Sequence, residues 1–296
     1  MPNAAHQRDL PSLRPMIKHW LPITRLKIFG AGILYRGTTL FAGTGKRIIV
    51  RDGVKYEVDL TEGIELSMFL FGRFQSHITR NAFLRLDPAA VVIDIGANVG
   101  LMTLQFASMV PRGRVYSFEP THYALARLKR NIALNPQMAD RISVINAFVS
   151  ERSDSRPAIV AYSSWKVNGE RSGSDHPVHL GTPKSTEGVP AASLDDFVAR
   201  EQPARIDLIK VDTDGHEYEV FRGAEGTIAR YRPRIIFEIG LYVMEEKGIT
   251  FDFYDRYFSR IGYRLVDTKT GAAVTLENHR RHIPRKGSID LIALPV

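Results

Sequence analysis

Four side chains that can accept or donate protons lie within one short stretch of the sequence. Asp212, Asp214, His216 and Glu217 directly follow IDLIKV, an apolar run at 206–211. Such groups are costly to bury unless they bind a ligand or one another, and carboxylates and imidazoles are the usual general bases of enzymes. Helix capping by Asp214 and Glu217 accounts for two of the four, but it explains neither Asp212 nor the preceding Lys210. The sequence therefore predicts that this turn binds a ligand.

A glycine turn after the run VVIDI forms a second candidate site. Gly96 and Gly100 allow a tight turn and the close approach of a ligand to the backbone, and Glu119 follows nineteen positions after Gly100. An acid about 20 residues after such a turn holds ribose hydroxyls in α/β folds. Asn98 and Leu101 replace the second and third glycines of the G-x-G-x-x-G fingerprint of dinucleotide folds. The pattern therefore favours a nucleoside ligand and argues against a nicotinamide cofactor.

Both sites follow apolar runs that read as buried strands and alternate with helical segments. The expected strands are 91–95, 114–118, 142–146, 206–211, 234–239, 263–267 and 288–294, and the expected helices are 98–109, 121–134, 217–231 and 251–261. This alternation is typical of a mainly parallel sheet covered by helices on both faces, with ligands at the carboxyl ends of its strands. Glu238 interrupts the apolar run RIIFEI, and we expect it near the acidic turn in either a structural or a catalytic role.

The segment before residue 91 has a different organisation. Asp52-Gly53 separates two alternating runs across 47–60, which is a strong hairpin signal, and 64–86 has the apolar spacing of a helix. The polar stretch 163–188 is either a lid over the site or a disordered loop. We therefore divide the chain into a basic arm at 1–46, a hairpin and helical lead-in at 47–90, and an α/β domain at 91–296 with the insertion 163–188.

The positive charge of the chain is concentrated at its beginning. The 296 residues carry a formal net charge of +8, and positions 1–51 hold nine Lys and Arg against one Asp. This segment is either a solvated arm or a surface that attracts lipid headgroups or another anion, while no aromatic-interleaved basic patch indicates nucleic acid. The chain has no Cys, which excludes disulfides, Cys-ligated clusters and thiol catalysis. No membrane-spanning run or secretory signal is found, so we expect a cytoplasmic protein, peripheral to the inner membrane face if the arm binds lipid.

Four stretches resemble the FkbM family of S-adenosylmethionine-dependent methyltransferases. They read VVIDIGANVGLMTLQFA, RVYSFEP, SLDDF and DLIKVDTDGHEYEVFRGAE, and the resemblance extends over residues 50–295. It implies the class I methyltransferase fold, which is Rossmann-like, with a mainly parallel seven-stranded sheet, helices on both faces and an N-terminal hairpin and helix extension. The implied reaction is methyl transfer from S-adenosylmethionine to a hydroxyl of a sugar, a glycan or another hydroxylated metabolite.

The resemblance also implies roles for individual residues. The implied cofactor-binding set is Asp94, Gly96, Asn98, Gly100, Glu119, Asn146, Ala147 and Asp212. The glycine turn would line the amino-acid part of the cofactor, Glu119 the ribose, and Asn146-Ala147 the adenine. The catalytic candidates are Asp212, Asp214, His216 and Glu217. Asp212 is the favoured base because the family signature leaves the position of His216 free, and no metal is implied.

Two other functions stay open on the sequence alone. One is a non-catalytic binding module in which the basic arm is the functional part, and the other is a nicotinamide-dependent oxidoreductase. The acidic turn argues against the first, and the altered glycine fingerprint argues against the second. We expect the partner to be a small molecule or glycan with a hydroxyl group, anionic or lipid-linked, which residues 1–51 bring to the site by peripheral membrane contact. We expect no nucleic acid.

Overall fold

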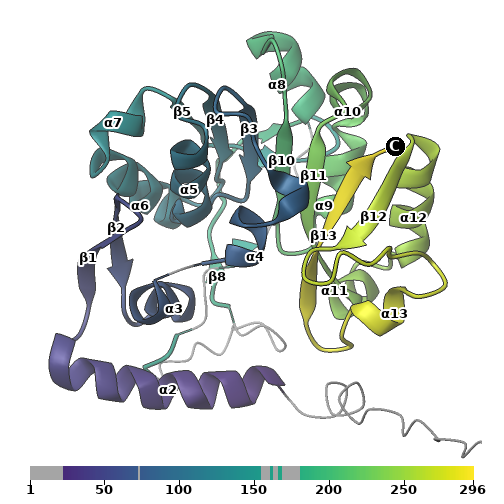
Figure 1. Ribbon diagram of the computed structural model, residues 1–296. Coiled ribbons are helices and arrows are strands. Elements are labelled where there is room, and N and C mark those ends of the chain that lie inside the picture. The colour runs from purple at the N-terminus through teal and green to yellow at the C-terminus, as the bar shows by residue number, and fades with distance from the viewer. Residues whose placement is uncertain (1–22, 73, 155–160, 163–165, 169–180) are drawn as a thin grey trace, which may run out of the picture.

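The computed structural model describes residues 23–72, 74–154, 161–162, 166–168 and 181–296. Its centre is a seven-stranded sheet with the strand order β12-β13-β11-β10-β3-β4-β5 (Figure 1). The strands are β3 (Val91–Ile95), β4 (Arg114–Phe118), β5 (Ile142–Ile145), β10 (Leu208–Val211), β11 (Arg234–Gly240), β12 (Tyr263–Asp267) and β13 (Ser288–Pro295). β13 pairs antiparallel with both neighbours, and the other pairs are parallel. The predicted class I methyltransferase architecture is confirmed.

The strand order reverses beside β3. From β3 the chain first builds β4 and β5 on one side and later returns to build β10 and β11 on the other. In open α/β sheets, ligands bind outside the carboxyl ends of the strands at such a switch point. The glycine turn after β3 and the acidic turn after β10 both lie at this position.

Each face of the sheet is covered by its own apolar cluster. Alternate strand residues point to opposite faces, so Ile93 belongs to one cluster and its neighbour Val92 to the other. The Ile93 face packs against α8 (Leu194–Glu201), α9 (Glu217–Arg222), α10 (Glu225–Tyr231), α11 (Leu241–Glu246) and α12 (Phe251–Arg260). The Val92 face packs against α5 (Leu101–Met109), α7 (Pro136–Ala139) and the lead-in before β3.

The lead-in begins with the predicted hairpin. β1 (Lys46–Arg51) and β2 (Val54–Asp59) pair antiparallel around Asp52-Gly53, and the alternate side chains of Val54, Tyr56 and Val58 are buried. Two side-chain amides of α6 (His122–Ala133) and the turn after it, Asn131 and Asn135, bind the backbone of β2. The hairpin is therefore fastened to the α/β domain.

The single helical segment expected over 64–86 is wrong. The structure has α3 (Gly63–Phe71), α4 (Ser76–Thr79) and a short 3-10 helix, η1 (Ala82–Leu84). α3 ends where Gly72 adopts a φ of +70°, a left-handed conformation that glycine tolerates. The helix expected over 217–231 is likewise divided into α9 and α10, because the chain turns at Gly223-Ala224.

Several elements were not expected from the sequence. The longest is α2 (Ile23–Ala42), within the segment treated as a basic arm, and it lies below α3 in Figure 1. β6 (Phe148–Val149) pairs with β9 (Ala191–Ala192) on either side of the insertion, and β7 (Ala161–Tyr162) before the insertion pairs with β8 (Pro183–Lys184) inside it. The short helix α13 (His279–His282) precedes β13. Of the insertion itself, 163–165 and 169–180 lie outside the described residues.

Candidate active site

The candidate site lies where β3, β4 and β10 end. The backbone N–H groups of Gly96 and Ala97 both donate to the carbonyl of Phe118, the last residue of β4. On the other side, the N–H of Asp212 donates to the carbonyl of Ile95. The glycine turn is therefore held between the end of β4 and the acidic turn after β10.

The glycines of this turn are required by the fold itself. Gly96, Asn98 and Gly100 have φ values of +80°, +50° and +89°. A Cβ atom at Gly96 would lie 1.8 Å from the backbone oxygen of Asp212, and one at Gly100 would lie 2.5 Å from Cδ1 of Leu128. The two glycines let β10 and α6 approach the turn closely, whatever they also do for a ligand.

Glu119 joins the glycine turn to the first turn of α6. Its Oε2 accepts from the N–H of Asn98 at 2.8 Å, and its Oε1 accepts from the N–H and the hydroxyl of Thr121 at 2.8 and 2.6 Å. Burial raises the pKa of this carboxyl, and these hydrogen bonds counteract the rise. Since a carboxylate offers about four acceptor positions, one position on Oε2 stays available. Asn146 donates to the carbonyls of Glu119 and Pro120, and Ala147 is buried beside it.

A buried lysine links the two candidate acids of β3 and β10. Nζ of Lys210 lies 3.4 Å from Oδ1 of Asp94 and 3.3 Å from Oδ2 of Asp212. Burial lowers the pKa of Lys210, but the charges of Asp212 and Asp94 outweigh that effect and raise it. The side chain of Asp212 is 26% exposed, whereas that of Asp94 is fully buried. Asp212 is thus the carboxylate of this pair that a substrate can reach.

Asp212 belongs to a row of acids across three adjacent strands. Val211 pairs with Phe237, which places Asp212 beside Glu238, and Glu238 pairs with Asp290 of β13. Paired residues share a face of a sheet, and this is the face of Val92 and α4. Burial, followed by the charges of Asp212 and Asp290, raises the pKa of Glu238 well above its ordinary value.

A residue of the lead-in contacts this acid row. Nε2 of His77, from α4, lies 2.5 Å from Oδ2 of Asp290, and the hydroxyl of Ser288 donates to Glu238. His77 and Asp290 were missed by the sequence analysis. A charge within the apolar run SIDLIAL was a usable signal for Asp290, as it was for Glu238, but no sequence signal marked His77.

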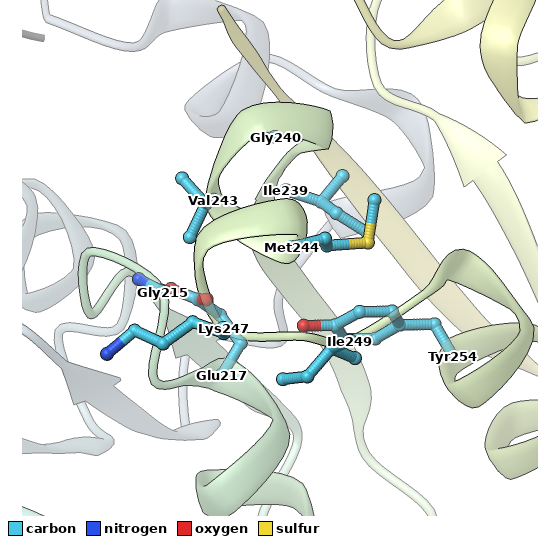
Figure 2. A pocket seen from close by; sticks show the side chains of 9 residues that line it. All are labelled: Gly215, Glu217, Ile239, Gly240, Val243, Met244, Lys247, Ile249 and Tyr254. Atoms are coloured by element: carbon cyan, nitrogen blue, oxygen red, sulfur yellow. Dashed lines mark hydrogen bonds between the residues drawn. The ribbon is translucent and has the colours of Figure 1, made fainter. Parts of the chain in front are cut away.

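Glu217, the last acid of the turn, lies on the opposite face of the sheet. Oε1 of Glu217 accepts from the N–H and hydroxyl of Thr213, both at 3.0 Å, and from the N–H of Gly215 at 3.3 Å. Burial raises the pKa of Glu217. Figure 2 shows Glu217 with Lys247 and Tyr254 around a pocket beneath α11. Glu217 therefore stabilises the turn by hydrogen bonds from the Ile93 face of the sheet.

His216 has partners for both of its ring nitrogens. Nδ1 lies 3.3 Å from Oε1 of Glu219, and Nε2 lies 3.1 Å from Nζ of Lys247. Its ring also packs edge-on against Phe148 at 5.1 Å between centroids. Asp214, with a φ of +53°, lies at the bend between Asp212 and these groups. The four catalytic candidates are adjacent in sequence, but the structure separates Asp212 from His216 and Glu217.

The family model described as the methyltransferase FkbM domain matches residues 94–265, more than half of the chain. The chain belongs to the FkbM methyltransferase family. Within the part of the chain that the structure describes, no three His, Asp or Glu side chains are arranged to hold a metal ion.

Similar proteins include the 2-O-methyltransferase NoeI of Sinorhizobium fredii, 28% identical over 156 residues, which cover 49% of this chain and 61% of NoeI. The AMB antimetabolite synthetase AmbE of Pseudomonas aeruginosa is 27% identical over 183 residues, 52% of this chain and 8% of AmbE. The match thus spans about three fifths of one relative and a small part of the other. A solved FkbM methyltransferase from Methylobacillus flagellatus is 17% identical with a TM-score of 0.45, covering 73% of this chain and 47% of that one.

Proposed function

We propose that this FkbM-family methyltransferase uses S-adenosylmethionine to methylate a hydroxyl oxygen of a sugar, a glycan or another hydroxylated metabolite. The observation that carries the proposal is the position of Asp212, a partly exposed carboxylate beside the glycine turn at the switch point of the sheet. The similarity to a relative named as a 2-O-methyltransferase supports oxygen as the acceptor atom.

The residues at the switch point fit this cofactor. Glu119 keeps an acceptor position for a ribose hydroxyl, as described above. Oδ1 of Asp94 is buried, forms an ion pair with Nζ of Lys210 at 3.4 Å and accepts no hydrogen bond, so it would have an acceptor position for the amino group of the cofactor. Oδ2 of the same carboxylate is held at 2.7 Å by the hydroxyl of Thr103, which fixes its orientation. Asn146 and Ala147 border the same edge and would flank the adenine.

The protein has little covalent chemistry to perform. Bound S-adenosylmethionine supplies a methyl group already activated on a sulfonium. Asp212 would orient the acceptor hydroxyl towards that methyl group and take up its proton as the carbon–oxygen bond forms. Lys210 holds Asp212 in place by the 3.3 Å ion pair. Burial and the charges of Asp212 and Asp290 raise the pKa of Glu238, which favours its neutral form beside Asp212.

The acceptor would approach from the Val92 face, between the acid row and the lead-in. On this placement Asp212 would be the base. The partners Glu219 and Lys247 of both ring nitrogens of His216 support Asp212 over His216. Glu217 is the acid that holds the turn, and Asp214 shapes its bend.

The experiment uses tritiated methyl donor with glycan, lipid and polyketide fractions of the source cell. The fraction that becomes labelled then serves as acceptor for Asp212→Asn and His216→Gln. We expect Asp212→Asn to lower turnover at least ~100-fold with unchanged cofactor affinity, and His216→Gln to retain most of it. Normal turnover by Asp212→Asn would refute Asp212 as the base, and label on nitrogen instead of oxygen would refute O-methylation.

A further inference from the structure

The outer surface of α2 is unusually apolar. The described parts of the chain expose ten large apolar side chains, and four of them lie on this one helix. They are Ile33, Leu34, Leu40 and Phe41, with Leu40 82% and Phe41 94% exposed. Exposed apolar residues scattered singly need no explanation, but a group of this kind marks an interaction site.

These four side chains form one stripe. Ile33 and Leu40 are seven residues apart, as are Leu34 and Phe41, and seven residues make about two helical turns. The opposite side of the helix faces the protein, because Tyr35 packs against the core cluster and Thr38 is buried. The stripe therefore points away from the body, and no described residue covers it.

The segment that carries the stripe is basic. Residues 23–51 contain no Asp or Glu, and their basic residues are Arg25, Lys27, Arg36, Lys46, Arg47 and Arg51. An apolar helical face within a segment rich in Lys and Arg is typical of helices that lie in the headgroup region of anionic membranes. No helix among the described residues is long and apolar enough to cross a membrane, so α2 would lie along the surface.

α2 also lies at the same edge of the molecule as the candidate site. A Cβ atom at Gly32 would be 3.8 Å from the backbone oxygen of Val167, and the adjacent Lys166 forms a 2.8 Å ion pair with Glu62. Glu62 in turn accepts from Tyr123, in the first turn of α6, four residues after Glu119. Figure 1 shows the same arrangement, with α2 below α3 and α4.

We propose that α2 docks the protein on an anionic lipid bilayer. Ile33, Leu34, Leu40 and Phe41 insert among the headgroups and upper acyl chains, and the exposed basic side chains of Arg36, Lys46 and Arg47 contact anionic headgroups. This orientation turns the carboxyl edge of the sheet towards the membrane. The docking itself does not depend on the proposed reaction, and an acceptor carried by a lipid would then be within reach of Asp212.

The test is flotation of the full chain with vesicles of phosphatidylcholine alone or mixed with phosphatidylglycerol. We expect binding to the mixed vesicles, weak binding to neutral ones, and a decrease with added salt because exposed charges are screened within about 8 Å at physiological ionic strength. The double variant Leu40→Glu, Phe41→Glu should bind mixed vesicles at least tenfold more weakly. Leu276→Glu, at a side chain 43% exposed elsewhere on the surface, is the matched control and should bind like wild type.

Several results would overturn the proposal. Equal vesicle binding by wild type and the double variant would show that the stripe does not insert. Equal binding of wild type to neutral and to mixed vesicles would show that the basic residues do not contribute. Sedimentation velocity without lipid tests whether the stripe instead binds a second copy of the chain. A dimeric wild type and a monomeric double variant would mean that the stripe is a self-association surface. Because no methyl transfer is measured, these outcomes are independent of the proposed reaction.

Discussion

Glu119 offers the sharpest test of the cofactor site. Glu119→Gln keeps the size of the side chain but removes its charge and replaces one acceptor oxygen with an N–H₂ donor. The carboxylate already accepts three hydrogen bonds, from the N–H of Asn98 and from the N–H and hydroxyl of Thr121. One acceptor position on Oε2 is left for a ribose hydroxyl, and this is the position most affected by the amide.

The magnitude follows from the loss of that one charged hydrogen bond. Hydrogen bonds to charged groups contribute ~1.5–3 kcal/mol, which corresponds to a dissociation constant for S-adenosylmethionine about 10- to 150-fold higher. Equilibrium dialysis with the labelled cofactor measures it directly. Far-ultraviolet circular dichroism and thermal melting establish that the variant is folded, since a donor now faces the N–H of Asn98.

Thr121→Val is the informative control. It removes one of the donors that occupy Glu119 and so frees a second acceptor position for the ribose. It also removes the hydroxyl that caps α6 by accepting from the N–H of Ala124, which should lower the free energy of unfolding by ~1 kcal/mol. We expect its cofactor affinity to equal or exceed that of wild type. An unchanged dissociation constant in Glu119→Gln would refute the ribose assignment.

Three further predictions concern stability. Because the pKa of Glu238 is raised in the folded protein, its protonated side chain contributes stability that is complete below the ordinary pKa of 4.5 and is lost as the pH rises through the folded-state pKa. Glu238→Gln cannot ionise, so its free energy of unfolding should increase relative to that of wild type as the pH rises. Urea unfolding at several pH values measures this difference. Gly96→Ala should lower the free energy of unfolding by ~2–4 kcal/mol, because its Cβ would overlap the backbone of Asp212 and its φ is positive. Gly188→Ala has open space around its Cβ and a φ of +75°, so it should lose only the smaller amount due to the positive φ. Arg127→Met leaves the buried Glu65 without its ion-pair partner and should cost ~3–5 kcal/mol in the same assay; a loss below ~1 kcal/mol would show that the ion pair is dispensable.

The strand pattern was readable from the sequence because each strand is a short, mostly apolar run. All seven expected strands of the central sheet are present, within a few residues of their predicted bounds. The helices were less readable where a residue with special backbone geometry ends them, as Gly72 does for α3. α2 was missed because its basic residues suggested a solvated arm, and its glycines lower the intrinsic helix propensity.

The sequence predicted the cofactor part of the candidate site better than its acidic part. The glycine turn and Glu119 keep the spacing expected of a nucleoside site, and the structure brings them together. The acidic turn reads as one cluster, but Asp214 and Gly215 have φ values of +53° and +102°, which direct Glu217 away from Asp212. Asp290 lies beside Glu238 because β13 pairs antiparallel with β11. The residue types of the two strands do not predict this pairing or its register.

Calorimetric titration of the full chain with S-adenosylmethionine, and separately with NAD, tests the central claim most directly. A single saturable site for S-adenosylmethionine, weakened by Glu119→Gln, and no heat of binding with NAD are the predicted results. Saturable binding of NAD, or no binding of S-adenosylmethionine by the folded protein, would contradict the claim that the switch point between β3 and β10 is a methyl-donor site.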